Sequence, residues 1–385
     1  MKKITSLSAL ALCCVGTAHA GGIERSTGSV GFMFEEGTYA EFTYGSVSPD
    51  VSGMQAVPLF SPGEVFPSSS GDMTGDYTTW AIAFKTDLSE RLSLGFLIDQ
   101  PLGADVNYAP DSGYAYGGSS LLFGGSTAEI ENTGFTAILR YEFPSNFSIH
   151  GGLRHLRTSG EVALFNGYQM RTDTAEDFGY LVGIAWEKPE IAARVALTYQ
   201  SSITHDFNAS ETILPAGIIG AATSFATEVP QSVTLDFQTG IMADTLLFGS
   251  VRWVDWTAFD ITPTLYATPA GLNLGSLVDY TNDTITYSLG LGRKFSDKWS
   301  GAVTLGYEKE EDGFSGNLGP TDGYKSLGLA LTRTAGNVKI TGGARYIWIG
   351  DAETQAPAPY PAGTTLARFQ DNEGVALGLR IGYMF

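Results

Sequence analysis

Cysteine and basic residues are scarce in this 385-residue chain, and each shortage argues against a class of function. Both cysteines, Cys13 and Cys14, fall within residues 1–20, which have the pattern of a secretory signal peptide. The mature chain would then hold no cysteine, so we expect neither disulfides nor thiol chemistry. The 22 Lys and Arg residues are outnumbered by 41 Asp and Glu, which argues against nucleic acid as a partner.

Long apolar runs are also missing beyond the predicted signal peptide. That peptide is defined by Lys2 and Lys3, the apolar run 4–16 and the small-x-small cleavage site 18–20. No later stretch reaches the length of about 18 apolar residues that a transmembrane helix needs, so a closed β-barrel is the remaining way to cross a bilayer. The 48 Gly, 22 Phe, 18 Tyr and 6 Trp residues suit small lumen positions and aromatic girdles.

The last eleven residues, 375–385, alternate between two faces. One face is apolar with an aromatic end and the other is small or cationic: Val375, Leu377, Leu379, Ile381, Tyr383 and Phe385 against Ala376, Gly378, Arg380, Gly382 and Met384. In a transmembrane barrel the apolar face meets lipid and the other lines the lumen. The alternative is the final strand of a soluble sandwich. A chain ending on Phe385 also looks like the terminal strand that the barrel assembly machinery of the outer membrane recognises.

Fourteen candidate strands are joined by connections that alternate between short and long. The strands are expected over 38–48, 77–87, 91–101, 131–143, 147–159, 176–187, 190–206, 228–240, 244–259, 280–296, 299–309, 323–334, 338–350 and 370–385. The long loops are expected over 49–76, 102–130, 160–175, 207–227, 260–279, 310–322 and 351–369. Long extracellular loops opposite short periplasmic turns are typical of outer-membrane barrels.

We therefore predict an all-β protein, a transmembrane antiparallel barrel of about 14 strands, in the outer membrane of a Gram-negative bacterium. Its predicted parts are a signal peptide (1–20), a short N-terminal plug-like segment (21–37) and the barrel (38–385). Outer-membrane lipids would surround the barrel.

Four motifs in this order resemble the FadL/TodX-type family of outer-membrane transporters for long-chain fatty acids and hydrocarbons. They are Leu94-Gly95-Phe96 with Gln100-Pro101-Leu102-Gly103 and Tyr108; residues 194–201 (RVALTYQS) running on to Phe207; residues 251–259 (VRWVDWTAF); and the turn Asp297-Lys298-Trp299. The resemblance implies a fourteen-stranded barrel with an amino-terminal plug. It also implies a kinked third strand that opens the wall sideways to the bilayer.

The resemblance suggests residues for the plug and for the kink. Phe32, Met33 and Phe34 could form a small apolar plug, although the segment is shorter than the family's and lacks its Asn-Pro-Ala motif. The alternative is that this segment extends the first strand. Gly95, Pro101 and Gly103 could supply the wall kink, because Pro lacks the ladder N–H and Gly weakens a strand. Alternatively, Pro101 simply ends the strand and begins a loop.

Three predicted loops are unusually apolar for exposed segments, and such patches usually mark binding surfaces. The loop-borne candidates for solute binding are Phe60, Leu121, Leu122, Phe123, Ile213, Leu214, Ile218, Ile219 and Phe225. The alternative is that these loops pack against one another as a lid.

A fatty acid would also need a cation for its carboxylate, and Arg can bind that group bidentately. Alternation places Arg140, Arg154, Arg194, Arg252, Arg345 and Arg380 on lumen faces, where most would pair with carboxylates such as Glu142, Asp236 and Glu308. Arg194 and Arg252 are the first candidates for ligand binding. They lie on strands that border the apolar loop or carry a family motif.

The sequence does not favour an enzyme. His155 and Ser159 are four positions apart on one strand, too far for a nucleophile–base contact, and His205 beside Asp206 is read as a solvated pair at a strand end. No His or Cys cluster has metal-ligand spacing, so no metal and no cofactor are expected.

The predicted function is passive transport of hydrophobic solutes, foremost long-chain fatty acids. Apolar extracellular loops would capture the solute, and a gap in the barrel wall would release it into the membrane. A general porin for small polar solutes is the alternative, and it would have a water-filled lumen. An adhesin or structural barrel is a third and more distant interpretation.

Overall fold

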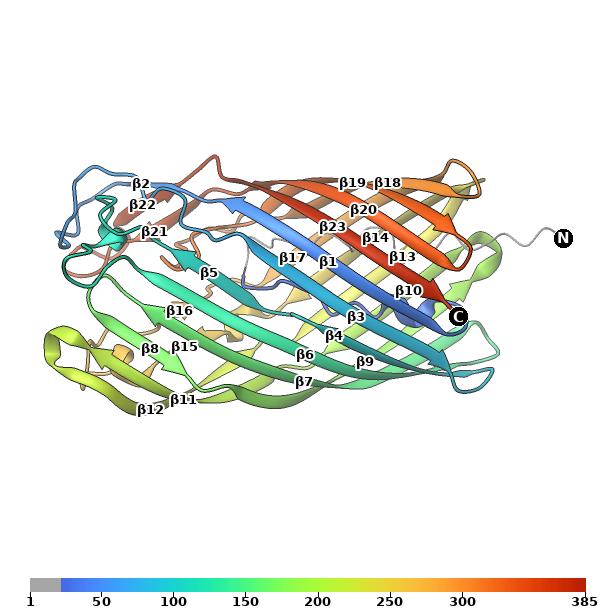
Figure 1. The fold of residues 1–385 in the computed structure, drawn as a ribbon, viewed down its shortest axis with the longest axis horizontal. Helices are drawn as coiled ribbons and strands as arrows, with labels where there is room; N and C mark the ends of the chain where they lie inside the picture. Colours follow the sequence, from blue (N-terminus) through green and yellow to red (C-terminus); the bar gives the residue numbers. More distant parts are fainter. Residues whose placement is uncertain (1–21) are drawn as a thin grey trace.

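The computed structural model describes residues 22–385, so the predicted signal peptide (1–20) lies outside the described residues. The chain forms a closed antiparallel barrel (Figure 1). Strand β1 (Tyr39–Asp50) pairs on one side with β3 (Tyr77–Asp87) and on the other with β23 (Glu373–Met384), which closes the wall. The barrel has fourteen wall strands, so the predicted fold class is confirmed.

Four of the wall strands are each interrupted once and therefore carry two labels. These are β4 (Leu92–Asp99) with β5 (Gly103–Asn107), β8 (Tyr168–Thr172) with β9 (Ala175–Lys188), β10 (Ala193–Gln200) with β11 (Ile203–Ile213), and β12 (Ile218–Val229) with β13 (Ser232–Met242). The uninterrupted ones are β1, β3, β6 (Thr127–Glu142), β7 (Phe147–Ala163), β14 (Thr245–Val254), β17 (Thr284–Lys294), β18 (Trp299–Glu308), β19 (Tyr324–Ala335), β20 (Val338–Ile349) and β23.

Short elements lie outside the wall. The small strands are β2 (Gly53–Gln55), β15 (Asp260–Ile261), β16 (Val278–Asp279), β21 (Ala352–Gln355) and β22 (Thr365–Phe369). The helical turns are η2 (Gly31–Phe34), η3 (Ala115–Gly117), η4 (Pro189–Ile191), η5 (Leu214–Ala216), η6 (Trp256–Ala258) and α1 (Thr264–Ala267). Within residues 22–385, no helix is long and apolar enough to cross a membrane.

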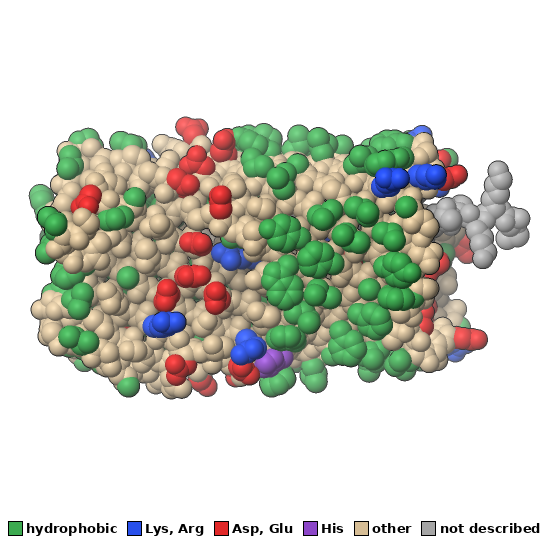
Figure 2. Space-filling view, in the orientation of Figure 1, with side chains coloured by type: hydrophobic (Ala, Val, Ile, Leu, Met, Phe, Trp, Pro, Cys, Tyr) green, Lys and Arg blue, Asp and Glu red, His purple; other side chains and the backbone are tan. Residues whose placement is uncertain are grey.

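The outer surface carries a broad band of apolar side chains. They gather over the half of the barrel nearer the chain termini, and charged side chains lie along the edge of the band (Figure 2). The band includes Phe42, Ile82, Phe96, Leu139, Leu153, Val182, Leu197, Leu235, Leu289, Leu305, Leu329, Ile340 and Leu379, all exposed. Contact between such a surface and the hydrocarbon of a bilayer is favourable, whereas its contact with water is unfavourable. The surface is that of a barrel embedded in a bilayer.

The two ends of the barrel differ as the sequence predicts. The short turns and the C-terminus lie at one end, and the long connections lie at the other (Figure 1). The long connections pack on one another through a cluster that includes Met73, Tyr108, Tyr114, Leu366 and Phe369. Phe385 is exposed at the short-turn end, and its recognition by the assembly machinery stays a prediction.

The expected loop 207–227 is wrong, because this segment is a β-hairpin. Residues 203–213 form β11 and residues 218–229 form β12, and their ladder runs from Ile203 opposite Val229 to Ile213 opposite Ile218. Apolar residues therefore gather here because one face of each strand points inward, as the alternating burial of β11 shows. The hairpin continues the barrel wall beyond the bilayer.

Candidate functional site

Residues 22–37, called here the N-terminal segment, lie inside the barrel. The amide of Arg25 donates to the Pro101 carbonyl at 2.7 Å, and the Gln200 side-chain amide donates to the Thr27 carbonyl at 3.1 Å. Glu24 forms a buried two-point ion pair with Arg252 on β14, with contacts of 2.5 and 3.1 Å. These contacts hold the segment against opposite sides of the inner wall.

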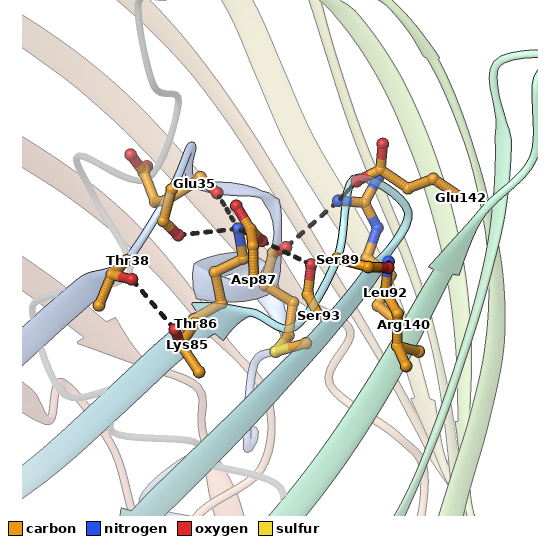
Figure 3. Close-up of polar contacts among 12 residues, drawn as sticks. Glu35, Thr38, Lys85, Thr86, Asp87, Ser89, Leu92, Ser93, Arg140 and Glu142 are labelled. Atoms are coloured by element: carbon orange, nitrogen blue, oxygen red, sulfur yellow. Dashed lines mark hydrogen bonds and ion pairs between the residues drawn. The ribbon is translucent and has the colours of Figure 1, made fainter.

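A second group of contacts holds the segment at the short-turn end. The Lys85 ammonium donates to the carbonyls of Glu35 and Gly37 at 2.9 and 3.0 Å, and a guanidinium N–H of Arg140 donates to the Met33 carbonyl at 3.3 Å. Figure 3 shows Lys85 and Arg140 beside the segment. Both cations also meet wall carboxylates, Asp87 and Glu142 among them. The wall supplies the positive charge and the segment supplies backbone oxygens.

Phe34 lies between two arginines at this end. The guanidinium carbons of Arg140 and Arg194 are each 4.4 Å from its ring centroid, and His150 contacts the ring edge-on at 6.2 Å. Cation–π contacts of this kind contribute roughly 0.5–2 kcal/mol each. Phe32 and Met33 are buried next to it.

Two chambers of different chemistry lie in the described lumen, and residues of the N-terminal segment line both of them. The inner chamber, nearer the short turns, is lined by residues 25–31 and Phe34 and by the polar side chains Glu41, Asp99, Arg194, Thr198, Gln200, Asp236, Arg252, Arg345 and Arg380. Both arginines predicted to bind ligand lie here. Arg252 forms an ion pair with Glu24, and the guanidinium group of Arg194 stacks on the ring of Phe34.

The outer chamber, nearer the long loops, is lined mostly by hydrocarbon. Its wall includes Ile23, Leu102, Ala128, Ile130, Val162, Met170, Phe207, Phe225, Val229, Phe259, Ile261, Leu277, Val278 and Leu318. Among these described lining residues there is no Lys or Arg. An apolar cavity with few polar groups is the usual form of a site for a small hydrophobic ligand.

The connection 255–283 folds over the outer chamber and is pinned by Glu211. This fully buried carboxylate on β11 accepts hydrogen bonds from the backbone amides of Leu265 and Tyr266 at 2.9 and 3.1 Å. It also accepts from the hydroxyls of Tyr168 and Thr223 at 2.8 and 2.6 Å. One buried carboxylate thus ties the hairpin β11–β12 to the connection above it.

The wall next to the outer chamber has a gap in its hydrogen-bond ladder. Strand β3 pairs with β4 only over Ile82–Asp87, and no described strand pairs with its residues 77–81 on that side. The interruption between β4 and β5 falls opposite, at Gln100–Leu102, and Leu102 lines the chamber. Backbone bonds resume beyond the gap, where the Gly75 amide donates to the Asp105 carbonyl at 3.1 Å.

The residues predicted to kink the wall occupy different surroundings. Pro101 lies within the interruption and Gly103 begins β5 directly after it. A Cβ at Gly103 would come within 2.5 Å of the Arg25 guanidinium, which lies 4.2 Å from the Tyr77 ring centroid. Gly95 lies within the regular ladder, where a Cβ would come within 2.1 Å of the Met33 sulfur. Gly95 therefore makes room for the N-terminal segment.

The structure separates the predicted loop residues into two groups. Ile213 is buried, and Ile218, Phe225 and Phe123 are half-buried, with Phe225 in the outer chamber wall. Phe60, Leu121, Leu122, Leu214 and Ile219 are exposed at the long-loop end. Among the described residues that line the outer chamber, Phe225 is the one that belongs to the predicted loop residues.

The expectation for His205 is wrong, because its ring is buried and does not pair with Asp206. Its Nδ1 lies 2.7 Å from the Asp177 carboxylate and its Nε2 lies 2.9 Å from the Thr158 hydroxyl, within the outer chamber wall. This cluster could not be predicted from the sequence, because Thr158, Asp177 and His205 lie on three different wall strands. In residues 22–385 no group of three His, Cys, Asp or Glu side chains could hold a metal ion.

One titratable group in the long connections is strongly perturbed. Burial, together with nearby Glu311, Glu310 and Glu308, raises the pKa of Asp322 to about 6, although the Glu311 amide donates to the carboxylate and opposes this shift. Because the folded pKa lies above the unfolded value, this group stabilises the fold most at low pH. Its contribution is lost as the pH rises through about 6.

Solved structures share this architecture across nearly the whole chain. A FadL homologue from Pseudomonas aeruginosa superposes with a TM-score of 0.72 over 92% of this chain and 91% of its own, at 15% identity. The toluene transporter TodX of Pseudomonas putida gives 0.64 over 97% of each chain at 10% identity, and the toluene transporter TbuX of Ralstonia pickettii gives 0.63 over 97% of each at 13%. The chain has the fold of these proteins.

Likeness at this level of identity establishes the fold alone. No protein-family model and no curated protein matches the sequence. The function of the chain therefore has to be argued from its own chambers, N-terminal segment and wall gap.

Proposed function

We propose that this chain is a passive transporter of hydrophobic solutes in the outer membrane of a Gram-negative bacterium. The observation that carries the proposal is the apolar outer chamber, which lies directly behind the wall gap at Leu102. The neighbours support the proposal, since TodX and TbuX are described as toluene transporters. They are channels or transporters, and the proposed role likewise requires no catalysis and no cofactor.

The proposed route has three steps. Exposed apolar side chains at the long-loop end, such as Leu121 and Ile219, first take up the solute. The solute then occupies the outer chamber, and it leaves sideways into the bilayer between β3 and β5. The N-terminal segment acts as the plug, with Phe32, Met33 and Phe34 closing the straight path through the inner chamber. Movement follows the solute's own gradient.

Fatty acids are less well supported than the sequence suggested. The proposal of Arg194 and Arg252 as carboxylate sites required free guanidinium groups, but Arg252 is already neutralised by Glu24. Both arginines also lie in the inner chamber, on the far side of the N-terminal segment. A carboxylate would reach them only after that segment had moved.

Solute binding tests the chamber. We expect p-xylene to bind saturably to the purified protein in detergent, measured by calorimetry against a micelle blank. Phe225→Asp places a charge in the chamber wall and should abolish binding. Ala222→Asp is the matched control on the same strand, because Ala222 is exposed opposite Ser210 on the outer face of the wall, and it should leave binding unchanged. Equal binding by both variants would refute the chamber as the site.

Ion conductance in planar bilayers tests the general-porin alternative. A water-filled pore would give steady conductance in the unmodified protein, whereas the proposed plug predicts a closed barrel. Steady conductance together with no saturable p-xylene binding would favour the porin over the transporter.

A further inference from the structure

The outer chamber has a cluster of three buried polar side chains in its largely apolar wall. It is formed by Thr158 on β7, His205 on β11 and Thr227 on β12, all buried and all lining the chamber. His205 and Thr227 are direct cross-strand partners, so their side chains are neighbours on the inner face. The residues flanking them on these strands, Phe207, Phe225 and Val229, are apolar.

Two of the three side chains already have partners. Asp177 accepts a hydrogen bond from Nδ1–H of His205, so in the neutral ring Nε2 accepts from the Thr158 hydroxyl. The Asn132 amide in turn donates to the Thr158 oxygen at 2.5 Å. The imidazole is thereby held in one orientation and one tautomer beside the cavity.

Thr227 is the member of this cluster that lacks a partner. Its hydroxyl is buried, with the residue only 5% exposed, and no described protein atom forms a hydrogen bond with it. Leaving a buried hydroxyl without a partner is unfavourable, because it has lost its hydrogen bonds to water. A solute group in the chamber is therefore the natural partner for this hydroxyl.

The charge of the chamber narrows the chemistry of that solute. Along the described wall the charged residues are Glu129, Glu161 and Asp279, all acidic and all exposed. Arg25 of the N-terminal segment lies near Glu129 and Asp105, and no Lys or Arg is among the described residues that line the chamber. A carboxylate placed beside Thr227 would be desolvated without a Lys or Arg in the described chamber wall to compensate it, which is strongly unfavourable. An uncharged hydroxyl or carbonyl would need only one hydrogen bond.

We infer that the outer chamber selects uncharged hydrophobic solutes that carry a single hydroxyl or carbonyl group, bound by Thr227 beside the His205–Thr158 pair. Phenols, alcohols, ketones and esters with an apolar body belong to this class. The inference rests on the proposed function and names its solute class. It assigns the selection of the solute to polar residues of the chamber wall, and not to the loop residues or lumen arginines predicted from the sequence.

Three ligands of one shape test the inference. p-Cresol, p-xylene and p-toluate share a methylbenzene body and differ in a hydroxyl, a methyl and a carboxylate group. For the unmodified protein in detergent, calorimetry should show p-cresol binding about fivefold more tightly than p-xylene, as one net hydrogen bond gives. p-Toluate at neutral pH should show no binding.

Removing one hydroxyl group should remove the preference. Thr227→Val keeps the side-chain shape, so p-xylene should bind as before, which also reports a folded chamber, while the fivefold preference for p-cresol should vanish. Thr204→Val is the matched control, because Thr204 is an exposed threonine on β11 that points outward, and it should keep the preference.

The outcomes separate this inference from the proposed function. If p-cresol and p-xylene bind equally, or if Thr227→Val keeps the preference, the inference is overturned and the transporter proposal stands. If p-toluate binds as tightly as p-cresol, the selection of uncharged solutes is wrong. If no ligand binds at all, the proposed function itself fails.

Discussion

The ion pair between Glu24 and Arg252 makes a quantitative prediction about the plug. The two side chains are 9% and 7% exposed, and they anchor the N-terminal segment to β14 by two contacts. Removing one member of a buried pair typically costs about 3–5 kcal/mol, because the other charge stays buried and unpaired. At about 1.4 kcal/mol per tenfold, Glu24→Ala should raise the population of the undocked segment roughly a hundredfold to a few thousandfold.

Single-channel recording can measure this change. When the segment undocks, the inner and outer chambers become continuous. Glu24→Ala should therefore show frequent channel openings in planar bilayers, whereas the unmodified protein should show almost no current. Hydrogen exchange should show lower protection of the amide of Arg25, which donates to Pro101 in the docked state.

A double variant provides the control. Glu24→Ala combined with Arg252→Met replaces the buried pair by apolar groups, an exchange that is often neutral. The double variant should therefore be quieter than Glu24→Ala alone. If Glu24→Ala stays as quiet as the unmodified protein and keeps its exchange protection, the ion pair does not hold the plug and the reasoning is refuted.

Three further predictions concern other parts of the fold. Asp322→Asn should abolish a pH-dependent loosening of its loop, seen in the unmodified protein as falling hydrogen-exchange protection factors when the pH rises through about 6. Gly95→Ala should destabilise the docked segment by roughly 1–3 kcal/mol through the clash with Met33, measured by proteolysis of that segment, while Gly342→Ala, with open space at its Cβ, should not. Glu211→Ala should leave four hydrogen-bond donors without their acceptor and should speed hydrogen exchange of the Leu265 amide. An unchanged exchange rate of that amide would contradict the proposed role of Glu211 in holding the connection 255–283.

The wall of the barrel could be predicted from the sequence because its signals are local. The expected strand 77–87 coincides with β3, and the expected 338–350 differs from β20 by one residue, since alternation and turn residues act over a few positions. The same local signal misled at 207–227, where an apolar composition was interpreted as an exposed loop. The inward face of a strand that extends beyond the bilayer gives the same composition.

The candidate site could not be predicted, because its contacts join residues far apart in the sequence. Glu24 and Arg252 are 228 positions apart, and His205 meets Asp177 across 28. Alternation correctly placed Arg252 on a lumen face, but it carries no information on which carboxylate occupies that arginine. Pro101 and Gly103 indicated an irregular strand at this point, but the missing ladder between β3 and β5 depends on both strands and could not be predicted from one of them.

In the proposed route, the uptake of hydrophobic compounds is separate from the leakage of ions and hydrophilic compounds. Ions and small hydrophilic compounds need a continuous aqueous path, and the proposed plug would lie across that path, with Phe34 held between two guanidinium groups. The apolar chamber ends at the side wall, so its contents do not have to pass this obstruction. With the proposed route, a cell could raise the expression of this protein to take up a scarce hydrophobic compound without making its outer membrane more permeable to ions and hydrophilic antibiotics.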